Sequence, residues 1–321
     1  MNKLAVVIVS WNAKSYLEEC LRSLFRETSN LVLEVIAVDN GSVDGTAEML
    51  AVSFPQITLI RNERNLGFAA ANNIALRKIL EERTADDILL LNADIVVRDR
   101  AVERLVEALD ADPGAGAASP ALVLPDGRYQ TGVGGALPTV WSGLGYFLFL
   151  SRFLLPRTGA LFIHQPRFIR KGRSVRLDWL SGACLLLRRR ALETVGLLDE
   201  GYFFGLEDVD FGKKMKEAGL SMLYVPAITV THHHGISYRS VIGEVNTEWL
   251  RLLFAYVQKE HGRLAGGVFR ASAVAGFFLR LVGRAALAPF SRDSSRKEKL
   301  REAAAFFTFS LTGRGNHVIN P

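Results

Sequence analysis

Three polar clusters in this chain have the residue types that phosphate and proton chemistry require. Asn92-Ala-Asp94 follows the apolar run Ile88–Leu91, Glu207-Asp208 precedes a helical pattern, and three histidines occupy positions 232–234. An acid at the end of a buried parallel strand lies at the sheet edge where open α/β sheets bind ligands. Asp94 could therefore hold a divalent cation against a diphosphate, or it could be an ordinary turn or cap residue.

The elements that must position these clusters alternate in type through the first 110 residues. Strands are predicted at Leu4–Ser10, Leu33–Val38, Ile57–Ile60 and Ile88–Leu91, and helices at Ala13–Arg26, Asp44–Ala51, a segment ending near Leu80, and Arg100–Leu109. This rhythm predicts an α/β fold with a doubly wound, mainly parallel sheet and right-handed crossovers.

The second half of the chain has a less regular pattern. Strands are predicted at Asp178–Leu187 and Ser221–Val230, with a short helix at Arg190–Val195 and another helix that follows Glu207-Asp208 and stops at Gly219. The aromatic segment Trp141–Leu155 is too short to span a membrane, so it is a lid, a core helix or a segment that dips into a surface.

Composition narrows the class of protein. The chain has 321 residues, of which 49% are hydrophobic and 22% charged, as in a globular protein. Its two cysteines, Cys20 and Cys184, form neither a disulfide framework nor a metal-site pattern, which favours a reducing compartment. The run Leu4–Val9 is too short for a signal peptide, and no uncharged apolar run of about eighteen residues predicts a spanning helix.

The positive charge is concentrated at the C-terminal end. From residue 263 onward there are ten Lys and Arg against three acids, so the first 262 residues carry a net charge of about −1. Leu264–Phe290 is apolar but interrupted by arginines, which suits an interfacial amphipathic element on an anionic membrane surface. The alternatives are a helical cap packed on the rest of the protein, or a dimer face. A nucleic-acid partner is disfavoured because no binding motif is present.

Seven motifs occur in an order that resembles glycosyltransferase family 2, whose members are inverting enzymes with the GT-A nucleotide-diphospho-sugar transferase fold. Within that family they are most similar to the rhamnosyltransferase-like branch. The motifs are Val6–Asn12, Val38–Thr46, Asn65–Asn73, Leu91–Ile95, Trp179–Cys184, Phe203–Phe211 and His232–Ser237. In one departure, Asn92 stands where many glycosyltransferases have an aspartate, which leaves Asp94 as the charged metal ligand.

The resemblance implies a domain division and a donor site. Residues 1–243 would form the catalytic domain, with a nucleotide-binding half at 1–110 and an acceptor-binding half at 111–243. The resemblance does not cover the tail, for which composition predicts a basic, apolar helical extension at 244–321. The expected nucleotide-sugar contacts are Ser10, Trp11, Asp39, Asp44, Asn65, Gly67, Asn72 and Asn92. Asp39 would contact the base, or it could close an Asx-turn, and Asn65 could equally begin a helix.

The remaining motifs would supply the metal and the chemistry. By resemblance, Asp94 and His232 would bind Mg²⁺ or Mn²⁺, with His234 as the second choice. A site made of all three histidines is disfavoured because adjacent strand residues face opposite ways. Asp208 would be the general base, and Glu207 would orient it or bind the acceptor. The alternative is that Asp208 and Asp210 merely occupy a helix N-terminus, where acids are favoured. The acceptor pocket would take Trp179, Ser181, Gly182 and Ala183, with Tyr202–Phe204 as an apolar wall. For Trp179 the alternative is a packed strand residue.

The expected function is metal-dependent inverting transfer of a sugar to a cell-surface glycan or its lipid-linked precursor. By analogy the donor would be dTDP-L-rhamnose, and the enzyme would be cytoplasmic and peripheral at the inner face of the cell membrane. A hexosyltransferase that uses a UDP- or GDP-sugar is the sister alternative. A catalytically silent sugar-binding module is disfavoured by the intact acids and His232. An oxidoreductase is disfavoured because Ser-Trp-Asn follows the first strand instead of a glycine-rich turn.

Overall fold

The computed structural model describes residues 3–150, 172–233, 247–287 and 296–314. The chain divides into two compact units, one formed by 1–135 and 162–237 and the other by 136–161 and 238–321. We call them the catalytic unit and the helical unit. The helical unit takes in residues 136–161, which the sequence alone assigned to the catalytic domain.

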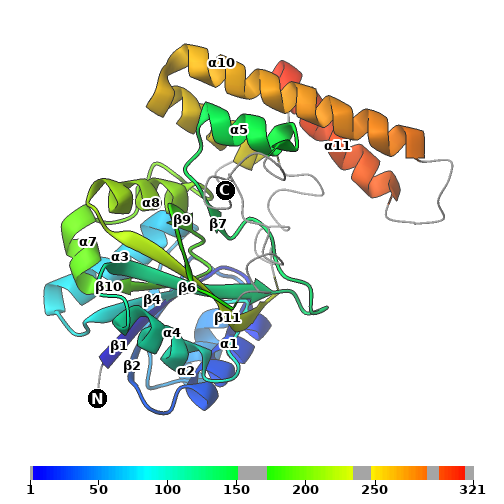
Figure 1. The fold of residues 1–321 in the computed structure, drawn as a ribbon. Helices are drawn as coiled ribbons and strands as arrows, with labels where there is room; N and C mark the ends of the chain where they lie inside the picture. Colours follow the sequence, from blue (N-terminus) through cyan, green and yellow to red (C-terminus); the bar gives the residue numbers. More distant parts are fainter. Residues whose placement is uncertain (1–2, 151–171, 234–246, 288–295, 315–321) are drawn as a thin grey trace. The chain divides into compact units, whose positions relative to one another are not determined.

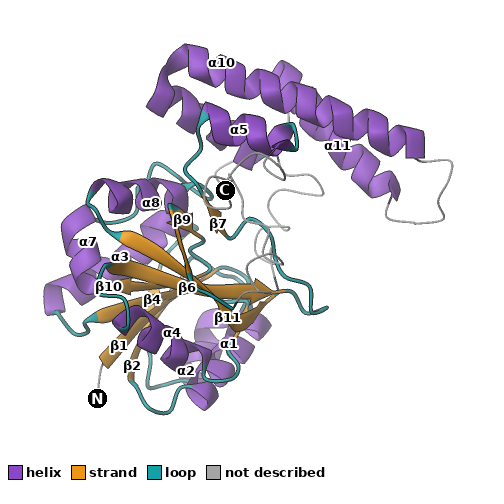
Figure 2. Ribbon diagram, viewed as in Figure 1, coloured by secondary structure: helices purple, strands orange, loops and turns teal. Residues whose placement is uncertain are grey.

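The catalytic unit is an α/β domain with helices on both sides of a nine-stranded sheet (Figures 1 and 2). Its first half contains β1 (Lys3–Ser10), α1 (Lys14–Glu27), β2 (Val32–Asp39), α2 (Thr46–Ser53), β3 (Thr58–Arg61), α3 (Phe68–Glu82), β4 (Asp87–Leu91) and α4 (Ala101–Asp110). The strands lie parallel in the order β3-β2-β1-β4, which confirms the doubly wound prediction. Leu4–Ile8 is almost fully buried, as expected of a central strand covered on both faces.

The second half of the sheet mixes strand directions. Its elements are β5 (Ile95–Val96), β6 (Ala115–Val123), β8 (Val175–Leu177), β10 (Cys184–Arg188), α7 (Arg189–Val195), α8 (Glu207–Glu217) and β11 (Ser221–His232). β10 runs antiparallel between β4 and β6, whereas β11 pairs with β6 in parallel. The predicted strand Asp178–Leu187 is wrong in one respect, because it divides into β9 (Trp179–Leu180) and β10. β9 pairs with β7 (Gly134–Gly135) outside the main sheet, which leaves a turn at 181–183.

The helical unit consists of α5 (Val140–Phe147), α10 (Glu248–Leu287) and α11 (Arg296–Thr312). α10 departs from helical geometry at Gly262, where φ is +86°. Phe147 of α5 is fully buried against the rings of Phe269 and Phe277. Gly143 admits this packing, since a Cβ there would lie 2.2 Å from the Phe269 ring. Of the three alternatives for this segment, the described part is therefore a core helix of the helical unit.

Three arginines in the C-terminal part of α10, Arg270, Arg280 and Arg284, have hydrogen-bond partners within the helical unit, whereas Arg251 and Arg263 are exposed. Arg280 donates to the carbonyls of Phe147 and Tyr146, at 2.8 and 3.2 Å. Arg270 donates to the carbonyl of Ser310 at 2.6 Å, and Arg284 donates to that of Lys299. These carbonyls are acceptors within the unit, and the bonds of Arg270 and Arg280 are partly buried whereas that of Arg284 is exposed.

One described helix, α10, is long and apolar enough to cross a membrane when judged by length and composition alone. An 18-residue window within it has a mean hydropathy of 1.4, and 33% of that window is buried inside the protein. This criterion tolerates up to two charged residues in the window, whereas the sequence prediction rested on the lack of an uncharged run of about eighteen residues, which still holds. The prediction that no helix spans a membrane therefore stays a prediction. Length and composition do not distinguish such a helix from one that packs in a helical unit.

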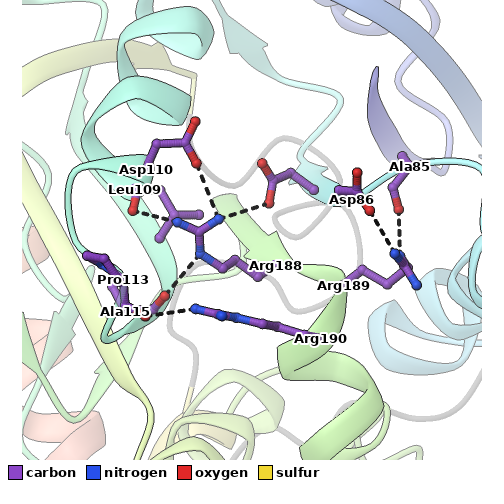
Figure 3. Close-up of polar contacts among 10 residues, drawn as sticks. Ala85, Asp86, Leu109, Asp110, Pro113, Ala115, Arg188, Arg189 and Arg190 are labelled. Atoms are coloured by element: carbon purple, nitrogen blue, oxygen red, sulfur yellow. Dashed lines mark hydrogen bonds and ion pairs between the residues drawn. The ribbon is translucent and has the colours of Figure 1, made fainter. Parts of the chain in front are cut away.

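Three consecutive arginines at the end of β10 tie the sheet together at the edge opposite to the carboxyl ends of β1 and β2 (Figure 3). Arg188 donates to the carbonyl of Leu109 at 2.8 Å and to Asp110 at 3.2 Å, and it lies 3.8 Å from Asp87. Burial raises the pKa of Asp87, and Arg188 partly offsets this rise. Arg190 is exposed and donates to the carbonyl of Pro113 at 2.7 Å.

We expect Arg188→Ala to lower the free energy of unfolding by about 2–4 kcal/mol, because the buried Asp87 would lose the cation that most favours its charged form and the Leu109 carbonyl would lose its donor. Arg190→Ala is the matched control and should cost at most about 0.5 kcal/mol. Urea unfolding followed by circular dichroism measures both. Equal losses in the two variants would show that Arg188 does not hold these elements.

Candidate active site

Asp94 and His232 are brought together by a short antiparallel ladder. Ile95 of β5 pairs with His232 at the end of β11, and the His233 N–H donates to the Asp94 carbonyl at 3.0 Å. The two side chains meet with His232 Nε2 3.1 Å from Asp94 Oδ1, and His232 is 4% exposed. β11 continues past its predicted end at Val230 because β5 supplies a partner for its last residues.

The neighbouring histidine faces elsewhere, as strand alternation requires. The ring of His233 lies 5.1 Å from that of Tyr16, and its Nε2 is 3.8 Å from Glu19. Only His232 therefore joins Asp94 among the described histidines of this run, and His234 lies outside the described residues. Within the described part of the chain, no three His, Cys, Asp or Glu side chains gather as a metal cluster.

Gln130 is a site residue that no sequence motif predicted. Its Oε1 lies 2.6 Å from Nδ1 of His232, so that ring nitrogen donates and the other ring nitrogen is left facing Asp94. The Gln130 backbone is held in turn by the Leu122 carbonyl of β6, which accepts its N–H at 2.9 Å. Gln130 lies 102 positions from His232, in a stretch of turns. Only the fold brings the two side chains into contact.

The turn between β9 and β10 links the Asp94 segment to α8. The Asn92 N–H donates to the Ala183 carbonyl at 2.8 Å, and Cys184 pairs with Leu91 across the two strands. On the other side of the turn, the backbone N–H of Gly182 lies close enough to the Asp208 carboxylate to favour its charged form and lower its pKa. The turn at 181–183 thus contacts both acidic motifs, which are more than 100 residues apart in the sequence.

Close packing of α8 on β9 aims Asp208 at that turn. Gly212 makes the approach feasible, since a Cβ there would lie 2.5 Å from the Asp178 carbonyl and 2.7 Å from Trp179. Trp179 itself is 3% exposed, in accord with the alternative of a packed strand residue. Gly182 packs against the Phe68 ring, where an added Cβ would lie 3.1 Å from a ring carbon, so the turn has little freedom to move.

Glu207 and Asp208 form an acid pair at the N-terminus of α8, where the helix dipole favours their charged forms. Burial, and secondarily the charge of Asp208, nevertheless raise the pKa of Glu207 to about 8. Burial also raises the pKa of Asp208 to about 6, although the N–H groups of Val209 and Gly182 stabilise its carboxylate. Desolvation therefore outweighs the dipole, and the pair is poised to hold and release a proton near neutrality.

Hydrogen bonds join the loops that follow β1 and β2 at the carboxyl edge of the sheet. Asp39 is 2% exposed, and its carboxylate accepts from the Ser42 N–H at 3.1 Å, which is the Asx-turn that the sequence left open. Asn12 donates its N–H to Ser42 Oγ and accepts from the Val43 N–H, at 3.0 and 2.9 Å. Ser10 is buried beneath these loops and Trp11 is partly exposed.

Asp44 has its carboxylate engaged by the protein. It accepts from the N–H groups of Lys14 and Thr46, at 3.0 and 3.1 Å, and from the Thr46 hydroxyl at 2.5 Å. These bonds join the starts of α1 and α2. The observed role of Asp44 is therefore structural, although the N-cap of α2 is Gly45 and not Asp44 as predicted. The predicted contact of Asp44 with a donor stays a prediction.

Asn40 organises the loop that contains Asn65 and Gly67, and no sequence motif singled it out. It is 2% exposed and donates to Asn65 Oδ1 at 2.8 Å, while it accepts from the Leu66 N–H at 3.1 Å. Gly67 has a φ of +84°, and a Cβ there would collide with the Phe203 carbonyl at 2.4 Å. Asn72 is 1% exposed and donates to the Phe68 carbonyl at 2.9 Å.

This loop also reaches the segment that precedes α8. The Phe68 N–H donates to the Phe203 carbonyl at 2.8 Å, and Asn73 exchanges hydrogen bonds with Leu198. The structure thus brings the Asn65–Gly67 loop, the 181–183 turn and the acid pair of α8 into one connected set of contacts. The predicted roles of these residues toward a donor or an acceptor stay predictions.

Comparison with known proteins identifies the family. A model of the family described as glycosyl transferase family 2 matches residues 5–172. An N-acetylglucosaminyl-diphospho-decaprenol L-rhamnosyltransferase of Mycobacterium tuberculosis is 34% identical over 237 residues, which cover 72% of this chain and 76% of that protein. The chain belongs to glycosyl transferase family 2. The expected family and its rhamnosyltransferase-like resemblance are confirmed, and the protein is a glycosyltransferase.

More distant relatives agree with this assignment. The low-salt glycan biosynthesis hexosyltransferase Agl10 of Haloferax volcanii is 21% identical over 241 residues, which cover 74% of this chain and 69% of that protein. The mannosyltransferase PcManGT of Pyrobaculum calidifontis, solved with GDP-Man and Mn²⁺, superposes with a TM-score of 0.53 at 18% identity over 97% of this chain and 87% of that one. GalNAc-T7, solved with UDP, GalNAc and Mn²⁺, superposes with a TM-score of 0.54 at 17% identity. The match covers 97% of this chain and 56% of that one. At these identities the two structures bear on the fold alone, and the predicted GT-A fold is confirmed.

We expect Glu207→Gln to stabilise the protein at pH 8. The pKa of Glu207 is raised on folding, so the unfolded chain loses this proton at lower pH than the folded chain, and stability falls as pH rises from about 4 to about 8. A neutral glutamine escapes that loss, and the gain should be on the order of 1–3 kcal/mol at pH 8. It should shrink toward pH 5. Thermal and urea unfolding at both pH values measure the difference.

Glu217→Gln, at the exposed end of the same helix, is the control. Its side chain is 63% exposed and pairs with Lys213 at 3.5 Å, so its loss should change the free energy of unfolding by less than about 0.5 kcal/mol. A destabilised Glu207→Gln variant at pH 8 would instead mean that the ionised carboxylate is held by favourable contacts.

Proposed function

We propose that this family 2 glycosyltransferase moves L-rhamnose from dTDP-rhamnose, with inversion and with a divalent cation, onto a cell-surface glycan or its lipid-linked precursor. Its relative at 34% identity is described as an L-rhamnosyltransferase that acts on a diphospho-decaprenol carrier, which supports both the donor and the acceptor class. The single structural observation that supports the inverting chemistry is the partly buried Asp208, held by Gly182 in a turn that also binds Asn92.

Asp208 is the proposed general base. Its carboxylate would take the proton of the acceptor hydroxyl as that oxygen forms its bond to the anomeric carbon, while the bond from this carbon to the diphosphate oxygen breaks. A pKa of about 6 leaves Asp208 mainly ionised at neutral pH yet basic enough to accept a proton. Glu207, whose pKa is raised further, would stay protonated beside it and limit repulsion within the pair.

Asp94 and His232 are the proposed ligands of Mg²⁺ or Mn²⁺. Two ligand atoms about 2.1 Å from one ion and at right angles to each other are roughly 3 Å apart. The 3.1 Å between Asp94 Oδ1 and His232 Nε2 fits that geometry, and the bond from Gln130 to Nδ1 leaves Nε2 as the coordinating nitrogen. When bound, the cation would offset the negative charge on the departing nucleoside diphosphate.

The nucleotide would be held by the loops at the carboxyl edge of β1, β2 and β4. Asp39, Asn65 and Gly67 belong to a contiguous set of loops there, joined through Asn40. Trp179 and the turn at 181–183 would border the sugar and the acceptor. We further propose that the enzyme works from the cytoplasm as a peripheral protein at the inner face of the cell membrane, where a lipid-linked acceptor and an anionic surface occur together.

Donor choice is tested by incubating the purified protein with Mn²⁺ and dTDP-rhamnose, UDP-sugars or GDP-sugars, and by measuring the released nucleoside diphosphate. We expect release from dTDP-rhamnose, stimulated by a polyprenyl-diphospho-sugar acceptor. Preferential turnover of a UDP- or GDP-sugar would assign the chain to the sister hexosyltransferase alternative. Absence of turnover together with intact nucleotide binding would favour a silent binding module.

Asp208→Asn should lower transfer by about 10²–10⁴-fold, because the amide cannot take the proton, while the variant should fold and bind nucleotide like wild type. In the wild type, kcat/KM should fall as pH drops below about 6, since protonation removes the base. Glu217→Gln serves as the control and should keep normal turnover. Near-normal transfer by Asp208→Asn would refute the assignment.

Measuring Mn²⁺ affinity distinguishes the role of His232 from that of His233. His232→Gln should abolish measurable Mn²⁺ binding, and Gln130→Leu should weaken it by about 10–100-fold because the ring would lose the partner that orients it. His233→Gln is the matched control, since that ring packs on Tyr16 and not on Asp94. Paramagnetic resonance of free Mn²⁺ reports the affinities without reliance on turnover. Equal affinities of wild type and His232→Gln would exclude His232 as a ligand.

A further inference from the structure

One side of α10 is exposed and apolar over a long stretch. Six exposed apolar residues recur there every three or four positions, and we call the surface that they form the α10 outer face: Leu264, Val268, Ala271, Ala275, Leu279 and Val282. Leu264 is 89% exposed and Leu279 is 53% exposed. The members recur every three or four residues, so they form a single stripe along the helix, about 27 Å long.

The stripe is free of polar groups. Every exposed residue of α10 between 264 and 286 is Gly, Ala, Val, Leu or Phe. Soluble proteins rarely leave a contiguous apolar surface of this length uncovered, and such a surface marks a binding site. Protein interfaces ordinarily carry a polar rim and several hydrogen bonds, which the α10 outer face has no side chains to make.

The charged residues of the same segment are turned away from the stripe and satisfied inside the unit. Arg270 and Arg280 donate to carbonyls, and the Arg280 guanidinium also lies 4.1 Å from the centre of the Phe149 ring. Arg284 lies 3.5 Å from Glu302 of α11. The three guanidinium groups therefore leave the apolar stripe uninterrupted by charge.

Basic residues border the stripe at its ends. Lys259 and Arg263 are exposed just before it, and Lys299 and Arg301 are exposed at the start of α11. The chain from residue 263 onward has a surplus of seven positive charges. An apolar stripe with basic flanks complements a lipid surface, which offers acyl chains below a layer of anionic headgroups.

We infer that the α10 outer face inserts into the acyl layer of an anionic membrane, with α10 lying along the surface and with Arg270, Arg280 and Arg284 on the side away from the lipid. This deepens the proposed membrane association, on which it rests, and it reverses the part played by the arginines. Headgroup contact falls to the flanking lysines and arginines, and hydrophobic burial of the stripe supplies the rest of the affinity.

Vesicle flotation tests the assignment with the full-length protein. The double variant Leu279→Asp with Val282→Asp places two charges on exposed positions of the outer face, so folding is spared. It should lose at least about tenfold in partitioning onto vesicles of phosphatidylcholine with phosphatidylglycerol. Val52→Asp, at a valine of α2 that is 82% exposed, is the matched control and should bind like wild type. Equal binding by the double variant and the wild type would overturn the inference.

Depth of insertion gives a second readout. Val282→Cys labelled with an environment-sensitive dye should be quenched by nitroxide groups on the acyl chains, whereas the same dye at Val52→Cys should not. The native thiols, Cys20 and Cys184, are buried and do not compete for label. Lipid-independent association of the protein that the double variant abolishes, without quenching at position 282, would assign the face to a second copy. Resistance of bound protein to alkaline extraction would indicate a span and contradict a helix that lies on the surface.

Release of nucleoside diphosphate from dTDP-rhamnose in lipid-free solution is measured on the same proteins. Intact release without vesicle binding would remove the surface assignment and leave the sugar-transfer proposal standing. Vesicle binding without release of nucleoside diphosphate from any donor would contradict the sugar-transfer proposal and leave the surface assignment standing.

Discussion

The antiparallel insertion of β10 between β4 and β6 is the constraint on which the candidate site depends. β4 ends at Leu91 and β10 begins opposite it at Cys184, so the turn that precedes β10 must lie beside the residues that follow β4. That placement puts Ala183 against Asn92 and Gly182 against Asp208. A parallel β10 would deliver this turn to the opposite edge of the sheet, where Arg188 now holds Asp110. Strand direction thus decides which polar residues can cooperate.

Burial of the acid pair of α8 lowers the stability of the folded protein near neutral pH. A helix N-terminus would ordinarily favour both charges, but Glu207 and Asp208 are desolvated and their pKa values rise. At the opposite edge, the cation Arg188 partly offsets the rise in the pKa of the buried Asp87. The charged forms of Glu207 and Asp208 are instead favoured by backbone N–H groups, and burial outweighs them. Such a pair destabilises the folded state near neutral pH and keeps a base available for chemistry.

The helical unit combines an aromatic interior with an apolar outer side of α10. Its interior is aromatic, with Phe147 packed on Phe269 and Phe277 and with Phe306 of α11 against Phe277, and its arginines cap carbonyl groups of neighbouring segments. The hydrogen bonds of these arginines are made to carbonyls within the unit. The outer side of α10 is apolar, since the exposed residues between the arginines are small, aliphatic or aromatic. A surface of this kind is unfavourable in water, and it becomes an advantage only where something apolar covers it.

Much of the architecture followed from the sequence, because local patterns are enough to specify it. The apolar runs Leu4–Ser10 and Ile88–Leu91 and the intervening helical spacing determined a parallel sheet, and ordered motifs from Asn12 to His232 determined the family. The break of Asp178–Leu187 into β9 and β10 did not follow, since an apolar run looks the same whether it pairs with one strand or two. Gln130 lies outside every motif, and Asn40 lies within Val38–Thr46 without a predicted role of its own. The importance of both arises from contacts with residues far away in the chain. The directions of Arg270, Arg280 and Arg284 were likewise invisible, because periodicity shows that they share a side of α10 but not whether that side faces water. Tertiary structure decided these points, since each depends on which distant groups are available to accept a hydrogen bond.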